Sequence, residues 1–182
     1  DAQRHALVRQ QILRAAGHQY REGYVQHWWH PPRYGVRTRI SDDKLFLPYV
    51  TALYVQITGD TSILSEEAPY LYGDPLSEEE TERLFSPEVS EISEPLRLHC
   101  LRAIDHVACG AHGLPLMGGG DWNDGMNRVG GENGESVWLG MFLCEVLRLF
   151  APLCEPSDTR RLLDRRSAML VSLDRYAWDG GW

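Results

Sequence analysis

The amino-acid sequence predicts an all-α protein, and three observations lead to this prediction. Apolar residues recur at helical spacing in five separate segments of the 182-residue chain. Long loops rich in Gly, Trp, His and charged residues separate some of these segments, and no stretch carries a convincing strand pattern. A chain of this length buries roughly 70% of its unfolded surface, which is enough to form a core.

The five predicted helices have ends that are marked by recognisable residues. Asp42 or Asp43 suits the N-cap of the second helix, Gly59 ends it, and Ser157 or Asp158 caps the fifth. The fourth helix is apolar enough to be buried on most sides. The apolar face of the second helix consists of Leu45, Leu47, Val50, Leu53, Tyr54 and Ile57. The predicted ranges are 3–17, 42 or 43–58, 95–111, 136–151 and 158–176.

Three stretches between the helices are predicted as loops. Residues 18–42 carry no long period and read as an ordered loop. Residues 65–94 hold ten acidic residues and one basic residue, which predicts an irregular, solvated excursion with short helical pieces at most. Residues 113–135 are rich in glycine. Long loops in compact domains are usually functional, so the first and third stretches are the candidate functional segments.

The composition excludes several classes of protein. The net charge of −8 argues against a nucleic-acid binder, which would show a basic face. No apolar run reaches the ~18 residues of a membrane span, and the N-terminal residues lack the apolar core of a signal peptide. The cysteines fit no zinc template, so they are expected to be buried on helices in a reducing, cytoplasmic compartment without a metal. They are Cys100, Cys109, Cys144 and Cys154.

The first loop, from Gln26 to Asp43, has the side chains of a carbohydrate pocket. Tryptophan faces stack on the C–H surfaces of sugars, and arginine and aspartate form bidentate hydrogen bonds to neighbouring hydroxyls or phosphate oxygens. Two alternatives remain open, namely that the tryptophans pack in the core and that two histidines bind a metal. The residues concerned are Trp28, Trp29, His27, His30, Arg33, Arg37, Arg39, Asp42 and Asp43.

The second loop, from His112 to Ser136, offers a carboxyl group beside a tryptophan. Burial against an indole raises the pKa of a carboxyl group, so that it can act as a general acid near neutral pH. A calcium loop from Asp121 to Glu132 fails because Gly125 and Met126 stand where a ligand and an invariant glycine are needed. An Asx-rich turn that only caps backbone N–H groups remains an alternative.

These segments together resemble glycoside hydrolase family 94. The resemblance rests on QHWWHPP, GVRTRISDD, HGLPLMGGGDWNDGMNRVG and GESVWLG, and it extends over most of the chain, with residues 65–94 as its weakest part. The similarity is greatest to the phosphorylase-type domain of cyclic β-1,2-glucan synthases and to 1,2-β-oligoglucan phosphorylases. It implies an (α/α)6 barrel, of which residues 1–182 would form roughly the first half.

The resemblance also implies a chemistry, that of the inverting phosphorylases. Inorganic phosphate is the co-substrate and no cofactor is needed, while the partners are a β-glucan oligosaccharide and glucose 1-phosphate. Asp124 matches the general acid, and Trp122 the residue that lines the adjoining sugar subsite. The best matches for holding the terminal glucose are Arg37 and Asp43, with Arg39 and Asp42 as neighbours in case the register differs, and Arg33 could approach the phosphate.

Two departures from the family pattern lead to further expectations. The family sequence usually continues beyond the final WDGGW and includes the rest of the phosphate site there, so this chain alone is expected to be inactive and able to form a homodimer. A glucan synthase parent would be attached to the inner membrane through other segments. Tyr24 stands where an acidic residue is expected. The alternatives are a carbohydrate-binding or scaffold piece, and an inverting hydrolase with a second carboxylate about 6.5–9.5 Å from the acid.

Overall fold

The computed structural model describes residues 2–126, 128–129 and 133–181. The chain divides into two compact units. The first comprises the chain up to Arg39 and then Asp43–His106, and the second comprises Ile40–Asp42 and the chain from Val107 onward. Both units contain α-helices, and the first also contains small β-sheets.

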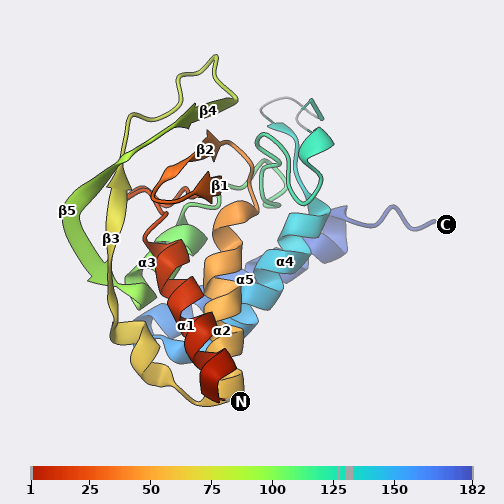
Figure 1. The fold of residues 1–182 in the computed structure, drawn as a ribbon. Helices are drawn as coiled ribbons and strands as arrows, with labels where there is room; N and C mark the ends of the chain where they lie inside the picture. The colour runs from red at the N-terminus through yellow and green to blue at the C-terminus, as the bar shows by residue number, and fades with distance from the viewer. Residues whose placement is uncertain (1, 127, 130–132, 182) are drawn as a thin grey trace. The chain divides into compact units, whose positions relative to one another are not determined.

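Three helices form the framework of the first unit (Figure 1): α1 (Ala2–Ala16), α2 (Phe46–Thr58) and α3 (Leu96–Asp105). Gly59 ends α2 in the left-handed conformation, with φ of 71°, and its N–H donates to the Val55 carbonyl, as its position in the sequence predicted. A 3-10 turn at Asp43–Leu45 precedes α2. Buried side chains that form the core of this unit include Ile12, Tyr20, Leu45, Ile63, Tyr70, Leu96 and Ile104.

The prediction of an all-α protein is wrong in one respect, because the first unit contains two small antiparallel sheets. One has the order β1-β2-β4 and the other pairs β3 with β5. Their bounds are β1 (Gln26–His30), β2 (Tyr34–Thr38), β3 (Glu67–Tyr72), β4 (Glu82–Phe85) and β5 (Glu88–Pro95). Most residues of β5 are exposed, so this strand lacks the alternation of apolar and polar residues by which a strand is recognised.

The sheets correct two predictions about loops. Residues 18–42 contain the β1–β2 hairpin, in which Trp28 pairs with Val36 and His30 with Tyr34. The acidic stretch 65–94 is not an irregular excursion, since it contributes β3, β4 and β5. Residues 73–81 connect β3 to β4, and β4 pairs with β2, with Arg83 opposite Arg37.

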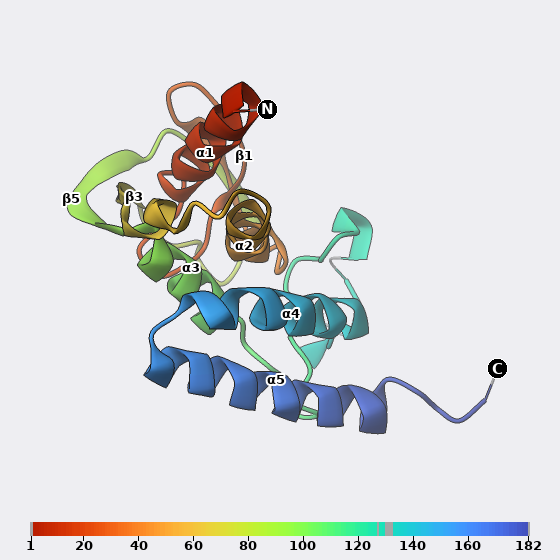
Figure 2. The same cartoon turned by 90° about the horizontal axis from the view of Figure 1, so that it is seen from below.

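Two long helices dominate the second unit, α4 (Val137–Phe150) and α5 (Pro156–Tyr176), which lie antiparallel and side by side in Figure 2. Ser136 caps α4, since its hydroxyl accepts the Leu139 N–H. Gly140 allows close packing, because a Cβ atom there would lie 3.2 Å from the side chain of Leu173. The core includes Leu139, Leu143, Leu147, Phe150, Leu162 and Met169.

Several helix ends differ from the predicted ones. Helix α5 begins at Pro156 with Glu155 as its N-cap, instead of Ser157 or Asp158, because proline is already favourable in the first turn. Helix α3 ends at Asp105, so the predicted continuation to residue 111 is wrong. Cys109 is therefore exposed outside a helix, whereas Cys100 and Cys144 are buried, and none of these four described cysteines forms a disulfide.

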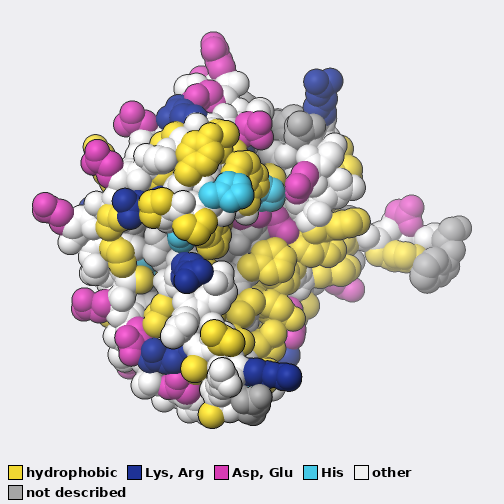
Figure 3. Space-filling view, viewed as in Figure 1, with side chains coloured by type: hydrophobic (Ala, Val, Ile, Leu, Met, Phe, Trp, Pro, Cys, Tyr) yellow, Lys and Arg dark blue, Asp and Glu magenta, His cyan; other side chains and the backbone are white. Residues whose placement is uncertain are grey.

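Some apolar faces are more exposed than predicted. Val50 and Ile57 of α2 are exposed, although both belong to its predicted apolar face. Helix α4 is less buried than predicted, since seven of its 14 residues are buried while Met141 is 57% exposed, and Figure 3 shows hydrophobic side chains over this helix. None of the described helices is both long and apolar enough to cross a bilayer.

Candidate active site

Arg37, a predicted sugar ligand, is buried in the first unit and contacts the segment that follows β3. Its Nη1 donates to the carbonyls of Gly73 (3.2 Å) and Asp74 (3.3 Å), and its Nη2 forms an ion pair with Glu22. The guanidinium lies 4.0 Å from the centre of the Tyr20 ring. Burial raises the pKa of Tyr20 to about 12, so the phenol stays neutral beneath the cation.

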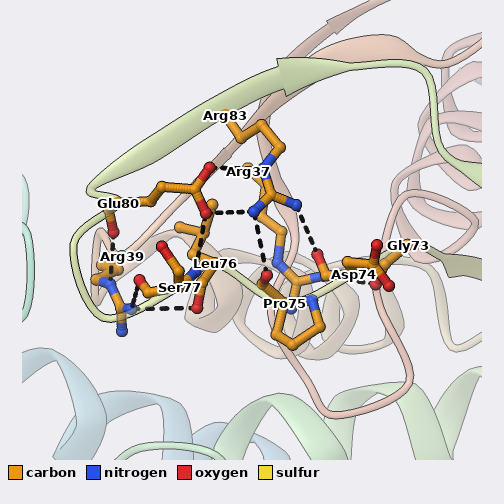
Figure 4. A network of polar contacts seen from close by, with 9 residues as sticks. All are labelled: Arg37, Arg39, Gly73, Asp74, Pro75, Leu76, Ser77, Glu80 and Arg83. Carbon is orange, nitrogen blue, oxygen red and sulfur yellow. Dashed lines mark hydrogen bonds and ion pairs between the residues drawn. The ribbon is translucent and has the colours of Figure 1, made fainter.

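Arg39 and Arg83 contact the same segment, as Figure 4 shows. Arg39 donates to the carbonyls of Glu80 (2.9 Å), Ser77 (2.6 Å) and Leu76 (3.3 Å). Arg83 forms an ion pair with Glu80, and this hydrogen bond lowers the pKa of Glu80 to about 2. We call Arg37, Arg39 and Arg83, together with residues 73–80, the arginine clasp.

Asp43 faces a histidine in the first unit. Its two carboxylate oxygens lie 2.9 and 3.0 Å from Nδ1 of His27, which can donate a proton to them. Both residues line a cavity of about 370 Å³ whose walls also include Trp29, Phe46 and Val50. The structure thus places Asp43 at the border of an apolar cavity that is large enough for a small ligand.

The surroundings of this cavity explain two other residues of the first loop. His18 is buried against Trp29, with their ring centres 4.0 Å apart, and burial lowers the pKa of this histidine. Trp28 is exposed, and its ring meets His30 edge to face. One tryptophan therefore lies against a buried histidine, and the other lies at the surface. The described residues contain no group of three or more His, Cys, Asp or Glu side chains that could hold a metal ion.

Tyr24, at the position where an acidic residue was expected, packs against two residues of the first unit. The ring of Tyr24 packs edge to face against His106, with centroids 4.3 Å apart. The Lys44 ammonium lies 4.9 Å from the centre of the same ring. A cation–π contact thus connects Tyr24 to the 3-10 turn that precedes α2.

In the second unit, residues 40–42 at the end of the GVRTRISDD motif contact the glycine-rich residues 118–120 of the second loop. The backbone of Ile40 pairs with that of Gly118, and Ser41 donates to the Gly120 carbonyl from its N–H (2.9 Å) and its hydroxyl (3.0 Å). Asp42, a candidate sugar ligand, is buried in the same unit. Two segments about 80 residues apart in sequence are therefore held together by hydrogen bonds.

The loop that carries the candidate acid is held by its buried carboxylate, Asp121. One oxygen of Asp121 accepts the Ser136 hydroxyl (2.5 Å), and the other accepts the Asn123 N–H (3.3 Å). The Ser136 oxygen in turn accepts the Leu139 N–H (3.0 Å) at the start of α4. This chain of bonds ties the loop to the helix N-terminus, so the Asx-turn interpretation holds for Asp121.

Asp124 and Trp122 are exposed on this loop. Asp124 begins a short 3-10 turn, Asp124–Met126, and Trp122 is 64% exposed. The expected burial of the acid against an indole is therefore not found in this structure. Gly120 has φ of +131°, and a Cβ atom there would lie 3.4 Å from the Asp124 Cα, so a glycine is needed at the base of the turn.

The other end of the loop is closed by a residue that sequence reasoning missed. Glu135 accepts the N–H groups of His112 (3.0 Å) and Leu114 (3.3 Å) and pairs with the His112 side chain.

Arg33, the candidate for the phosphate side, lies in the turn between β1 and β2, and its carbonyl accepts the Gln26 side-chain amide (2.9 Å). Glu132, the last ligand position of the rejected calcium loop, lies outside the described residues.

Comparison with known proteins assigns a family to this arrangement of loops. The profile described as "Glycosyl hydrolase 94 superfamily, catalytic domain" matches residues 3–182. The chain therefore belongs to the glycosyl hydrolase 94 superfamily, as the sequence motifs predicted.

Three curated relatives illustrate the functions found among similar proteins. The cyclic beta-(1,2)-glucan synthase NdvB of Rhizobium meliloti is 45% identical over 98% of this chain. Two proteins of Paenibacillus borealis, a 3-O-beta-D-glucopyranosyl-beta-D-glucuronide phosphorylase and a solabiose phosphorylase, are 30% and 27% identical over 90% and 97% of it. The chain spans 7% of the synthase and 20% and 21% of the two phosphorylases.

Proposed function

We propose that this chain supplies the acid-bearing part of an active site that phosphorolyses β-1,2-linked glucan. The observation that carries the proposal is the exposed pair Asp124 and Trp122 on a loop held through buried Asp121. The 45% identity to a cyclic beta-(1,2)-glucan synthase supports the choice of glucan. In this proposal Asp124 is the general acid, and Trp122 lines the glucose subsite beside it.

Phosphorolysis requires one carboxylic acid from the protein and correct positioning of the glucan and the phosphate. An oxygen of inorganic phosphate attacks the anomeric carbon, while the bond from that carbon to the leaving oxygen breaks with inversion. Asp124 gives its proton to the leaving oxygen. The products are glucose 1-phosphate and a glucan one unit shorter. Because phosphate is already an anionic nucleophile, the step needs no general base and no further cofactor, and its reversal extends the glucan.

The sugar-binding part of the proposal involves the first loop. Arg37 and Asp43 hold the terminal glucose, Arg39 and Asp42 are the neighbouring candidates, and Arg33 approaches the phosphate. Each guanidinium has five N–H donors. Arg39 makes three hydrogen bonds within the clasp, and Arg37 makes two there and one to Glu22. Arg39 is half-buried, so a sugar hydroxyl can bind beside the carbonyls that it contacts, whereas the Arg37 side chain is only 3% exposed and would reach a sugar only after its surroundings move.

The family membership also supports an architecture. We propose that residues 1–182 form one part, roughly the first half, of a single (α/α)6 barrel, and that the small sheets are inserted between its helices. On this proposal the remaining helices complete the phosphate site, so the chain alone is inactive and its uncovered apolar faces allow a homodimer. The parent protein would act in the cytoplasm, attached to the inner membrane through other segments.

An inverting hydrolase is less well supported by the described residues near the acid. Such an enzyme needs a second carboxylate to activate water, about 6.5–9.5 Å from the acid. Asp121 is the nearest aspartate in sequence, but it is buried and accepts hydrogen bonds from Ser136 and Asn123. A buried carboxylate that already accepts these bonds is poorly placed to take a proton from a catalytic water.

The test is product analysis with the full-length protein that carries this chain. With β-1,2-glucooligosaccharide and phosphate we expect glucose 1-phosphate, and Asp124→Asn should lower the rate by about 10² to 10⁴. Asp164→Asn, on the exposed surface of α5, is the matched control and should retain full activity. Free glucose as the product would indicate hydrolysis, and no product would favour the carbohydrate-binding or scaffold alternative. Unchanged activity of Asp124→Asn would exclude Asp124 as the acid.

A further inference from the structure

Helix α4 has two apolar faces, and only one of them packs in the core of its unit. Leu139, Leu143 and Leu147 are buried on the first face. Trp138, Met141 and Phe142 follow the spacing i, i+3, i+4 and share the second face. Met141 on this face is 57% exposed. An amphipathic surface helix normally carries polar residues there, so the second apolar face requires an explanation.

The rings on this face continue a row that starts in the loop of the candidate acid. The ring centres of Trp122 and Trp138 lie 6.4 Å apart at an interplanar angle of 51°, and those of Trp138 and Phe142 lie 5.3 Å apart at 32°. Trp122 is two residues from Asp124. The row therefore leads from the immediate neighbourhood of the acid along the first two turns of α4.

The start of this row is fixed by the polar contacts that hold the loop. Asp121, next to Trp122, accepts the Ser136 hydroxyl, and Ser136 caps the helix that carries Trp138. The loop and the first turn of α4 are thus bonded to each other beside the rings. At the far end of the face, Glu145 and Arg148 form an ion pair at 2.7 Å, which offers both an acceptor and donors.

These features fit a neutral oligosaccharide better than a charged ligand or an empty surface. Aromatic faces stack on the C–H surfaces of sugar rings, and a row of rings matches a chain of repeated sugar units. The 64% exposure of Trp122 leaves a large apolar area in water unless a ligand covers it. The carboxylate and guanidinium of Glu145 and Arg148 can bind hydroxyl groups at the end of the row.

We propose that Trp122, Trp138 and Phe142 form an aromatic track that binds the glucan chain on the leaving-group side of the scissile linkage. The inference rests on the proposed function, because the direction of the track is defined by Asp124 as the acid. Trp138 is then a substrate-binding residue that sets a preference for longer chains, since a disaccharide ends before it reaches Trp138. The track holds the chain while its terminal glucose reacts.

The test compares substrates of different length in the full-length protein. Trp138→Ala should lower kcat/KM for β-1,2-glucooligosaccharides of four or more units about tenfold, equal to about 1.4 kcal/mol, and change it less than twofold for the disaccharide. Trp138→Phe keeps a ring and should restore most of the loss. Met141→Ala, on the same exposed face but without a ring, is the matched control and should leave all substrates unaffected. Thermal melts followed by circular dichroism report whether each variant folds.

The outcomes separate this inference from the proposed function. An equal loss for all chain lengths, or a loss of the same size in Met141→Ala, would overturn the track. If the wild-type protein makes no glucose 1-phosphate, isothermal titration with a β-1,2-glucohexaose decides between the two proposals. If the wild-type protein binds the hexaose and Trp138→Ala weakens this binding about tenfold, the track is supported without phosphorolysis. If the variant binds as well as the wild type, or if the wild type does not bind, the track is overturned.

Discussion

The arginine clasp allows a prediction whose size follows from counted contacts. Arg39 donates three hydrogen bonds to backbone carbonyls of residues 73–80, at 2.6, 2.9 and 3.3 Å. In Arg39→Lys the charge remains, but a single ammonium cannot reproduce the planar fork of the guanidinium. We expect the variant to lose about two of the three bonds.

The loss of stability expected in Arg39→Lys is estimated from the usual free energy of a hydrogen bond to a charged group. Each such bond contributes about 1.5 kcal/mol when buried, and Arg39 is only half-buried, so about 1.5 kcal/mol is expected for the two together. This energy stabilises the local structure of residues 73–80 instead of the whole unit. Its loss should raise the equilibrium population of the locally open state, and with it the exchange rate of the amides there, about tenfold.

The assay is amide hydrogen exchange of residues 73–80. The Glu80 N–H donates to the Ser77 carbonyl, and the Ser77 N–H donates to the Glu80 carboxylate at 2.8 Å, so both amides report on opening. In Arg39→Lys they should exchange about tenfold faster, while α4 amides stay unchanged. Arg160→Lys, at an exposed position of α5, is the matched control. Exchange at the wild-type rate in Arg39→Lys would refute the clasp as the cause of local order.

Three further predictions concern the acid loop and the two cores. Gly120→Ala forces an alanine to φ of +131°, so the activity of the full-length protein should fall at least tenfold, while the α4 amides keep their exchange protection. Activity at the wild-type level would show that this backbone angle does not position Asp124. Burial lowers the pKa of His99 below its ordinary value of about 6.5, so protonation favours the unfolded chain and the urea midpoint of the first unit should fall as pH drops below 6.5. That pH dependence should shrink in His99→Gln, and an unchanged dependence would exclude this histidine. Leu143→Ala should lower the free energy of unfolding by about 2–5 kcal/mol in urea titrations, and a loss below 1 kcal/mol would mean that the α4–α5 core is loosely packed.

The sequence predicted the helices well because helix formation is local. Five periodic apolar segments correspond to the five α-helices, and Gly59 marks a real helix end. The strands were missed because most of them are short, because most residues of β5 are exposed, and because β4 pairs with a strand more than 40 residues earlier in the chain. Strand pairing over such a distance leaves little trace in a local pattern.

The candidate site was predicted in part, for a similar reason. The acid loop is a dense local motif, so Trp122 and Asp124 could be named from sequence, and the family assignment is confirmed. Most partners of Arg37 and Arg39 could not be named, because apart from Glu22 they are carbonyl groups 36–41 residues away that every residue type carries. Their roles in binding sugar stay predictions, as does the role of Asp124.

The same carbonyl contacts determine which mutations the segment between β3 and β4 can tolerate. Arg39 contacts only main-chain oxygens there, and Arg37 contacts two more, so these bonds do not depend on the side chains at residues 73, 74, 76 and 77. Positions 74, 76 and 77 can exchange residues without losing these bonds. Gly73 cannot, because a Cβ atom there would lie 2.8 Å from the Phe85 ring, and neither can Glu80, whose carboxylate pairs with Arg83. The acidic segment is therefore a suitable place to diversify sequence when new variants of this protein are made.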